Sequence, residues 1–159
     1  MNGEEICRAL DREAAAGADF KDIQELAVKL LHDSDPCFHW TGIYELFQDN
    51  VLRLGPFIGA PTDHVFIAVG RGVCGTAVAE RRNVNIADVR RESNYLACSS
   101  ETRSELVVLI RIGETIYAQI DIDSHDLDAF GPEQVQRVEQ VAAWLALQYE
   151  RQAARTVDG

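Results

Sequence analysis

The chain has 159 residues, of which 47% are hydrophobic and 26% charged, and its formal net charge is −11. This size and composition indicate one globular domain with its own core, and the negative charge disfavours nucleic acid, whose phosphates would be repelled. No apolar run approaches the roughly 18 residues of a membrane span, and the acidic N-terminus is unlike a secretory signal, so we expect a cytoplasmic protein without membrane partners.

Two helices are predicted in the first 35 residues. Ile6 and Leu10 recur at helical spacing, and Gly17 is a plausible end for the first helix. Asp19 can cap a second helix, whose apolar stripe ends at the breaker sequence DSDP. Both helices are therefore expected to bury one face.

From Phe38 onwards the apolar period changes to two, which indicates strands. The predicted strand FHWTGIYELF has Phe38, Trp40 and Tyr44 on one face, and a turn at Asp49 and Asn50 leads to VLRLGPFIG and then HVFIAV. Trp40 and Tyr44 could line a small-molecule pocket, although paired aromatic residues more often belong to a core.

A glycine-rich turn and a short helix, GRGVCGTAVAERR, come next, followed by a brief strand, NVNIADV, and a polar loop. The segment SELVVLIRIGETIYAQIDIDS is predicted to form a hairpin around Gly113. The last helix should begin with Pro132 at its first position and run to about Ala153.

This order predicts an α+β domain: an antiparallel sheet, with the N- and C-terminal helices packed on one face. We expect a single domain over residues 1–159. The helices at its start should occupy residues 1–35, the sheet and pocket residues 38–124, and the final helix residues 131–154.

Two carboxylates alternate with isoleucines in IDIDS, so Asp121 and Asp123 should share one face of a strand, about 7 Å apart. Such a pair could receive an ammonium group or hold a proton for acid catalysis. The alternative is a solvated strand end before a turn. The residues alone leave both interpretations open.

The cysteines are Cys7, Cys37, Cys74 and Cys98, and they show no CxxC pair or zinc-finger spacing, so no metal site is predicted. Cys74 begins a helix after a glycine-rich turn, where the helix dipole favours a thiolate, but it could equally be a small core residue. Cys98 lies in a polar loop seven residues before Glu105, so a thiol and a carboxylate could face each other, or never meet.

These segments together resemble the free methionine-(R)-sulfoxide reductases, which are GAF domains. The resemblance rests on HWTGIY, LRLGPFIG, VGRGVCGTAVAE, YLACSSETRSELVV and IDIDS, in that order. It implies a GAF-like sheet of about six strands and a homodimer packed through the terminal helices. It also implies a thiol-dependent reduction of free methionine-(R)-sulfoxide without a bound cofactor, using an external reductant such as thioredoxin.

The resemblance also implies roles for individual residues. Cys98 matches the cysteine that attacks the sulfoxide sulfur and becomes a sulfenic acid. Glu105 and Asp123, with Asp121 beside them, match pocket carboxylates that protonate the oxygen and bind the ammonium. Trp40 would pack on the methyl end of the substrate, with Tyr44 on the same face.

One position departs from the family. The resolving cysteine usually found ten residues before Cys74 is His64 here. Cys74, Cys37 or an external thiol could then resolve the sulfenic acid. The alternative is a non-catalytic GAF module that binds a small ligand or senses oxidants through Cys98.

Overall fold

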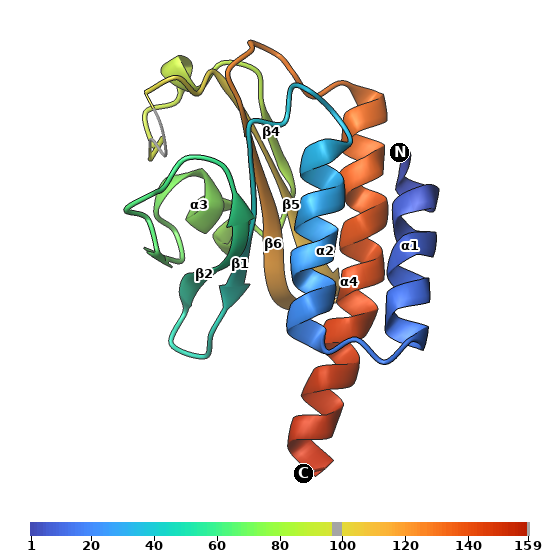
Figure 1. Cartoon of the computed structure of the whole chain (residues 1–159). Helices are drawn as coiled ribbons and strands as arrows, with labels where there is room; N and C mark the ends of the chain where they lie inside the picture. The colour runs from blue at the N-terminus through green and yellow to red at the C-terminus, as the bar shows by residue number, and fades with distance from the viewer. Residues whose placement is uncertain (97–99, 159) are drawn as a thin grey trace.

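The computed structural model describes residues 1–96 and 100–158 of the chain (Figure 1). Its helices and strands follow the predicted order. They are α1 (Gly3–Ala15), α2 (Phe20–Asp33), β1 (Trp40–Leu46), β2 (Val51–Ile58), β3 (Phe66–Ala68), α3 (Gly72–Glu80), β4 (Val84–Ile86), the 3-10 helix η1 (Val89–Arg91), β5 (Ser104–Ile112), β6 (Thr115–Ser124) and α4 (Pro132–Asp158).

The first two helices begin at side-chain caps that the sequence makes available. Asn2 accepts a hydrogen bond from the backbone N–H of Glu5, and Asp19 accepts one from that of Asp22, each at 2.9 Å. Gly17 follows α1 with a φ of +90°, a conformation that glycine adopts without steric cost. Local chemistry therefore accounts for where α1 ends and α2 begins.

The six strands form one antiparallel sheet in the order β3-β2-β1-β6-β5-β4. Strands β5 and β6 form the predicted hairpin, and β6 lies between β5 and β1 near the centre of the sheet. The α+β fold with about six antiparallel strands is thereby confirmed.

Helices α1, α2 and α4 stand side by side on one face of the sheet, while α3 lies on the opposite face (Figure 1). The larger core fills the space between these helices and the sheet, with residues such as Val108, Ile120 and Leu145 fully or almost fully buried. A second core lies under α3 and includes Val107, Leu109 and Ala77. Alternation along β5 sends neighbouring residues into different cores.

Strand register places several polar positions on the α3 face. Asp123 is paired with Trp40 on one side and with Glu105 on the other, and Asp121 is paired with Gly42 and Val107. Paired residues in an antiparallel sheet point to the same face, so Glu105, Asp121 and Asp123 all point away from the three-helix layer.

Three details differ from the sequence prediction. Phe38 precedes β1 and packs in the helix-side core, not beside Trp40, because regular alternation starts only at the strand itself. The predicted strand over NVNIADV ends at Ile86, and a 3-10 turn capped by Asp88 follows. Helix α4 continues to Asp158, beyond the expected end at residue 153 or 154.

Within the described residues, no helix combines the length and the apolar character that crossing a membrane requires.

Candidate functional site

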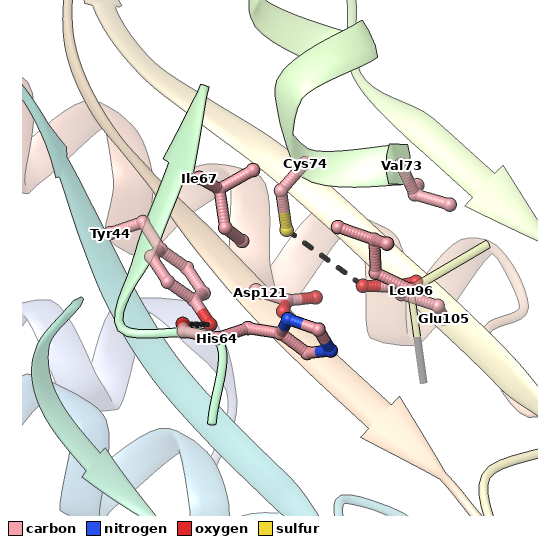
Figure 2. A pocket seen from close by; sticks show the side chains of 8 residues that line it. All are labelled: Tyr44, His64, Ile67, Val73, Cys74, Leu96, Glu105 and Asp121. Atoms are coloured by element: carbon pink, nitrogen blue, oxygen red, sulfur yellow. Dashed lines mark hydrogen bonds between the residues drawn. The ribbon is translucent and has the colours of Figure 1, made fainter. Parts of the chain in front are cut away.

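A small enclosed cavity lies between the sheet and α3 (Figure 2). It holds a free volume of about 10 Å³, enough for about one water molecule. Its walls come from β1, β3, α3, β5, β6 and two loops: Tyr44, His64, Ile67, Val73, Cys74, Leu96, Glu105 and Asp121. Residues far apart in the sequence therefore meet at one place.

The acidic pair of IDIDS belongs to the interior. Asp121 is 0% exposed and Asp123 is 1% exposed, so the alternative of a solvated strand end is wrong. Glu105, which is 4% exposed, is the residue opposite Asp123 across the β5–β6 ladder. The chain thus buries three carboxyl groups on one face of the sheet, which is a costly arrangement in the absence of a compensating role.

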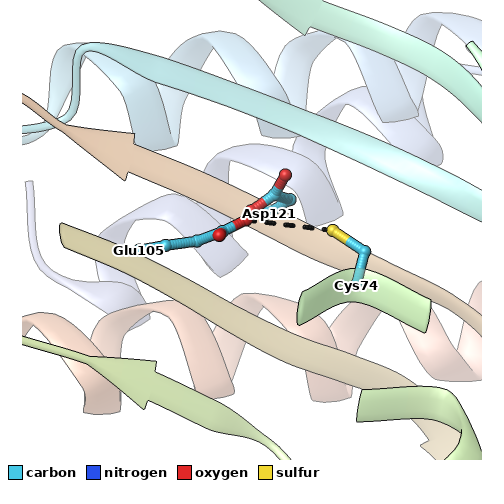
Figure 3. Close-up of side chains that lie close together, drawn as sticks. All are labelled: Cys74, Glu105 and Asp121. Atoms are coloured by element: carbon cyan, nitrogen blue, oxygen red, sulfur yellow. Dashed lines mark hydrogen bonds between the residues drawn. The ribbon is translucent and has the colours of Figure 1, made fainter. Parts of the chain in front are cut away.

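Cys74, Glu105 and Asp121 form a compact cluster (Figure 3). The thiol of Cys74 donates to Oε2 of Glu105 over 3.9 Å, and one ligand-type atom from each of the three residues lies within 4.8 Å of the others. Cys74 is on α3, whereas the carboxyl groups come from neighbouring strands. A thiol and two acidic groups can therefore exchange protons or share one ligand.

Burial dominates the ionisation of Asp121. Desolvation raises the pKa of this carboxyl above its usual value, and the contacts with Glu105 and Cys74 oppose only part of that change. Neither carboxyl oxygen of Asp121 reaches ordinary hydrogen-bond geometry with any described residue. Asp121 is thus suited to carry a proton at a pH where an exposed aspartate is ionised.

The backbone around Cys74 is held by two polar side chains. The amide of Gln119, on β6, donates to the carbonyl oxygen of Cys74 over 3.0 Å. Asn94 accepts from the N–H of Gly72 at 3.2 Å and donates to the Gly72 carbonyl at 3.1 Å and to the Thr76 hydroxyl at 2.6 Å. These bonds tie the start of α3 to the sheet and to the loop after η1, so the Cys74 thiol has a defined position.

The aromatic residues predicted for substrate binding, Trp40 and Tyr44, lie on the face of the sheet that α3 covers. Tyr44 lines the cavity, and its hydroxyl donates to the carbonyl of His64 over 2.8 Å. Trp40 stacks beside Tyr44 with ring centroids 6.3 Å apart and donates to the carbonyl of Ala60 over 3.0 Å. Gly42 makes room for this ring, since a Cβ there would lie 2.5 Å from it.

Several cavity residues had no role assigned from the sequence. His64 stood out only as the replacement of a family cysteine, and the apolar lining of Ile67, Val73 and Leu96 had no detectable sequence signal. Gln119 and Asn94 act through backbone contacts, which no local pattern reveals. The attacking cysteine of the resemblance, Cys98, lies outside the described residues.

The remaining thiols lie elsewhere. A hydrogen bond with Asp126, burial and the charge of Asp35 together raise the pKa of Cys37 to about 11, so its thiol is protonated at neutral pH. Cys7, on α1, donates to the Gln140 carbonyl of α4, and burial raises the pKa of its thiol. Neither environment favours a thiolate, which is the reactive form.

Comparisons with known proteins indicate one family. A sequence profile of the GAF domain matches residues 20–149. The free methionine-R-sulfoxide reductase of Escherichia coli K12 is 39% identical over 116 residues, which are 73% of this chain and 69% of that protein. Four further relatives have 52% to 62% of their length covered by this chain.

Solved structures of free methionine-R-sulfoxide reductases are also similar to this chain. The type II free methionine-R-sulfoxide reductase from Thermoplasma acidophilum is 34% identical with a TM-score of 0.77, over 84% of this chain and 96% of that one. The Neisseria meningitidis free methionine-R-sulfoxide reductase, solved with its substrate, is 29% identical with a TM-score of 0.84, over 94% and 90% of the two chains. The chain belongs to the GAF domain family, and within it to the free methionine-R-sulfoxide reductases.

Proposed function

We propose that this chain reduces free methionine-R-sulfoxide to methionine. The observation that carries the proposal is the buried meeting of a thiol with carboxyl groups from two strands, in a chain of this family. Supporting it, Leu96, two residues before Cys98, lines the same cavity as Glu105 and Asp121. The last described residue before Cys98 therefore borders the cavity that holds the acidic cluster.

In the proposed reaction the Cys98 thiolate attacks the sulfoxide sulfur, and Glu105 supplies a proton to the oxygen. The sulfur–sulfur bond formed in this attack and the sulfur–oxygen bond of the substrate then break, and a new bond joins that oxygen to the sulfur of Cys98. The sulfoxide sulfur gains two electrons and becomes the thioether of methionine, while Cys98 loses two and becomes a sulfenic acid. Asp121 and Asp123 would receive the substrate ammonium, with Tyr44 and Trp40 on the apolar side.

The size of the cavity favours a small substrate. It has room for about one water, so a molecule of the size of methionine sulfoxide requires side chains such as that of Leu96 to move. A free amino group can lie against the buried carboxylates, whereas a peptide bond at that nitrogen would remove its charge. We therefore propose that free, not peptide-bound, methionine sulfoxide is the substrate.

The second half of the cycle needs a thiol, because His64 stands where the family commonly has the resolving cysteine. Attack of a thiolate on the sulfenic acid, with uptake of one proton by the leaving oxygen, gives a disulfide and water. Cys74 is the internal candidate, since it lies at the cavity, whereas the raised pKa of Cys37, about 11, makes Cys37 the poorer one. A thioredoxin-like dithiol protein would complete the reduction in a reducing compartment such as the cytoplasm.

We further propose a homodimer packed through the terminal helices. The end of α4 extends beyond the other helices (Figure 1), and Leu147 on this helix is 47% exposed. A second copy of the helix would cover such a side chain.

The test is turnover of free methionine-R-sulfoxide, followed by NADPH oxidation through thioredoxin and its reductase and, separately, with dithiothreitol. Cys98→Ser should abolish turnover with both reductants. Glu105→Gln should lower kcat by roughly 10²- to 10⁴-fold, the usual contribution of a positioned acid. Glu114→Gln, on the exposed β5–β6 turn, is the matched control and should leave kcat unchanged.

Substrates modified at one position sharpen this test. The S-epimer and N-acetyl-methionine-R-sulfoxide should both be poor substrates, the latter because it lacks the ammonium group. Equal turnover of wild-type protein and Cys98→Ser, or efficient reduction of the acetylated compound, would contradict the proposed chemistry.

The substitution at His64 favours one second candidate, a GAF module that binds a small ligand or senses oxidants through Cys98. In such a protein Cys98 would be oxidised once per chain, without multiple turnover. Calorimetry with methionine, its sulfoxides and cyclic nucleotides would identify its ligand. Catalytic turnover with either reductant excludes this candidate as the main function.

A further inference from the structure

The cavity between α3 and the sheet contains three different metal-ligand side chains. A thiol from Cys74 and carboxyl oxygens from Glu105 and Asp121 all lie within 4.8 Å of one another. All three residues are buried, with exposed fractions of 5%, 4% and 0%. Cysteine thiolates and carboxylates are both ligands of zinc in proteins.

The separations match a zinc ion better than a larger ion. Ordinary Zn–S and Zn–O lengths of about 2.3 and 2.0 Å at a tetrahedral angle place the two ligand atoms roughly 3.5 Å apart. Cys74 Sγ and Glu105 Oε2 are 3.9 Å apart, so a contraction of a few tenths of an ångström is sufficient. Calcium takes six to eight oxygen ligands, whereas this cluster supplies two carboxyl groups and a thiol.

The electrostatics of the cavity also favour a cation. Asp121 is fully buried and lines the cavity, and neither of its oxygens reaches ordinary hydrogen-bond geometry with residues 1–96 and 100–158. A divalent ion would satisfy these oxygens and offset the charge that Glu105 and Cys74 contribute when deprotonated. A thiolate among the ligands selects a borderline-soft metal over magnesium.

We propose that this cavity is a zinc site, with Cys74 Sγ and one carboxyl oxygen each of Glu105 and Asp121 as protein ligands. The fourth position faces the cavity, which the imidazole of His64 also lines (Figure 2). The binding of the ion displaces protons from its ligands, so affinity rises with pH.

The effect of such an ion on catalysis rests on the proposed function. It occupies the acid and ammonium-binding groups and coordinates Cys74, so it excludes free methionine-R-sulfoxide from the cavity. Zinc is therefore a reversible inhibitor that competes with the substrate, and a chelator restores turnover.

The direct experiment measures binding to the reduced full-length protein and needs no catalysis. Co²⁺ serves as the optical probe for the zinc site, because a thiolate ligand produces a near-ultraviolet charge-transfer band. The wild-type protein should bind one Co²⁺ with this band, and Zn²⁺ should displace it. Absence of the band, or a band that Zn²⁺ does not remove, overturns the site.

Single substitutions identify the ligands. Cys74→Ser should abolish the band and weaken Zn²⁺ binding by roughly 100-fold or more, since even outer-shell changes cost about 10- to 100-fold. Asp121→Asn should keep the band but weaken binding at least about tenfold, and it tests the site independently if Cys74→Ser does not fold. A band retained in folded Cys74→Ser, or unchanged affinity in Asp121→Asn, contradicts the assignment.

A competing location provides the control. Cys37 lies beside Asp35 and Asp126 and is another thiol with carboxylate neighbours. Cys37→Ser should bind Co²⁺ and Zn²⁺ as the wild type does, and loss of the band in this variant would move the site there. Zinc binding through Cys74 in a protein without reductase turnover would overturn the proposed function and leave the metal site standing.

Discussion

Asp121 shows how one buried carboxyl group can lower the stability of a fold at neutral pH. The carboxyl is fully buried, and desolvation raises its pKa above the ordinary value of 3.8 despite the contacts with Glu105 and Cys74. In the unfolded chain this group releases its proton near its ordinary pKa, whereas the folded chain retains it to higher pH. The contribution of Asp121 to stability is therefore fully present below pH 3.8 and is lost as the pH rises through the folded-state pKa.

Replacing this carboxyl should stabilise the protein at neutral pH. Asp121→Asn removes the group that the folded state cannot easily ionise and retains its volume. We expect a higher melting temperature than that of the wild type at pH 7, and a difference that shrinks as the pH falls towards 4. Thermal unfolding followed by circular dichroism over this pH range measures both effects.

An exposed aspartate serves as the comparison for Asp121→Asn. Asp63 lies on the surface of the loop before β3, and Asp63→Asn should leave the melting temperature almost unchanged at every pH. If Asp121→Asn were less stable than the wild type at pH 7, the carboxylate would be stabilising and the sign of the pKa shift would be wrong.

At the scale of elements, the position of α3 depends on a close backbone approach. A Cβ on Gly75 would lie 2.5 Å from the carbonyl oxygen of Ala68 on β3 and 3.0 Å from the N–H nitrogen of Gly70. Gly70 also donates to the carbonyl of Gly75 over 2.8 Å. Since backbone atoms cannot rotate away as a side chain can, even one methyl group must displace the helix that carries Cys74.

Gly75→Ala should therefore destabilise the fold by about 1–3 kcal/mol, the usual result of overpacking. Urea unfolding gives this free energy. Gly131→Ala is the matched control, because its Cβ would meet only the flexible Gln134 side chain at 3.2 Å, and we expect a change within about 0.5 kcal/mol. Equal effects of the two substitutions would show that the α3–β3 approach is not tight.

Prediction from sequence was good for elements whose signals are local. The cap at Asp19, the two-residue period of β1 and the turn at Gly113 each act over a few residues. Prediction was weaker for features that depend on packing between elements. Phe38 was assigned to the wrong core because the period of a strand cannot reveal where the strand begins, and the 3-10 turn after β4 has no periodic signature.

At the scale of the whole molecule, the excess of negative charge affects the stability of the folded state. The formal net charge is −11, and most of the ion pairs among the described residues, such as Lys29 with Asp33, are exposed. Exposed pairs contribute little to stability, whereas mutual repulsion of the remaining acidic groups opposes folding.

Moderate salt should therefore stabilise the protein at pH 7. Increasing NaCl from about 0.01 M to about 0.15 M shortens the Debye length from about 30 Å to about 8 Å, which screens repulsion between distant carboxylates. We expect a higher melting temperature by scanning calorimetry. The increase should largely disappear near pH 4.7, the isoelectric point, and an equal increase at both pH values would rule out charge repulsion as its cause.

The amino-acid sequence by itself determined the α+β architecture, the hairpin of β5 and β6, and the shared face of Asp121 and Asp123, because helical and strand periods are local properties of the chain. Only the tertiary structure decided that this face is buried and that Cys74 meets Glu105, 31 residues further along the chain. It also brought His64 and Leu96 to the same cavity. Contacts of this kind depend on strand order and on how α3 packs across the sheet, and no local pattern encodes either.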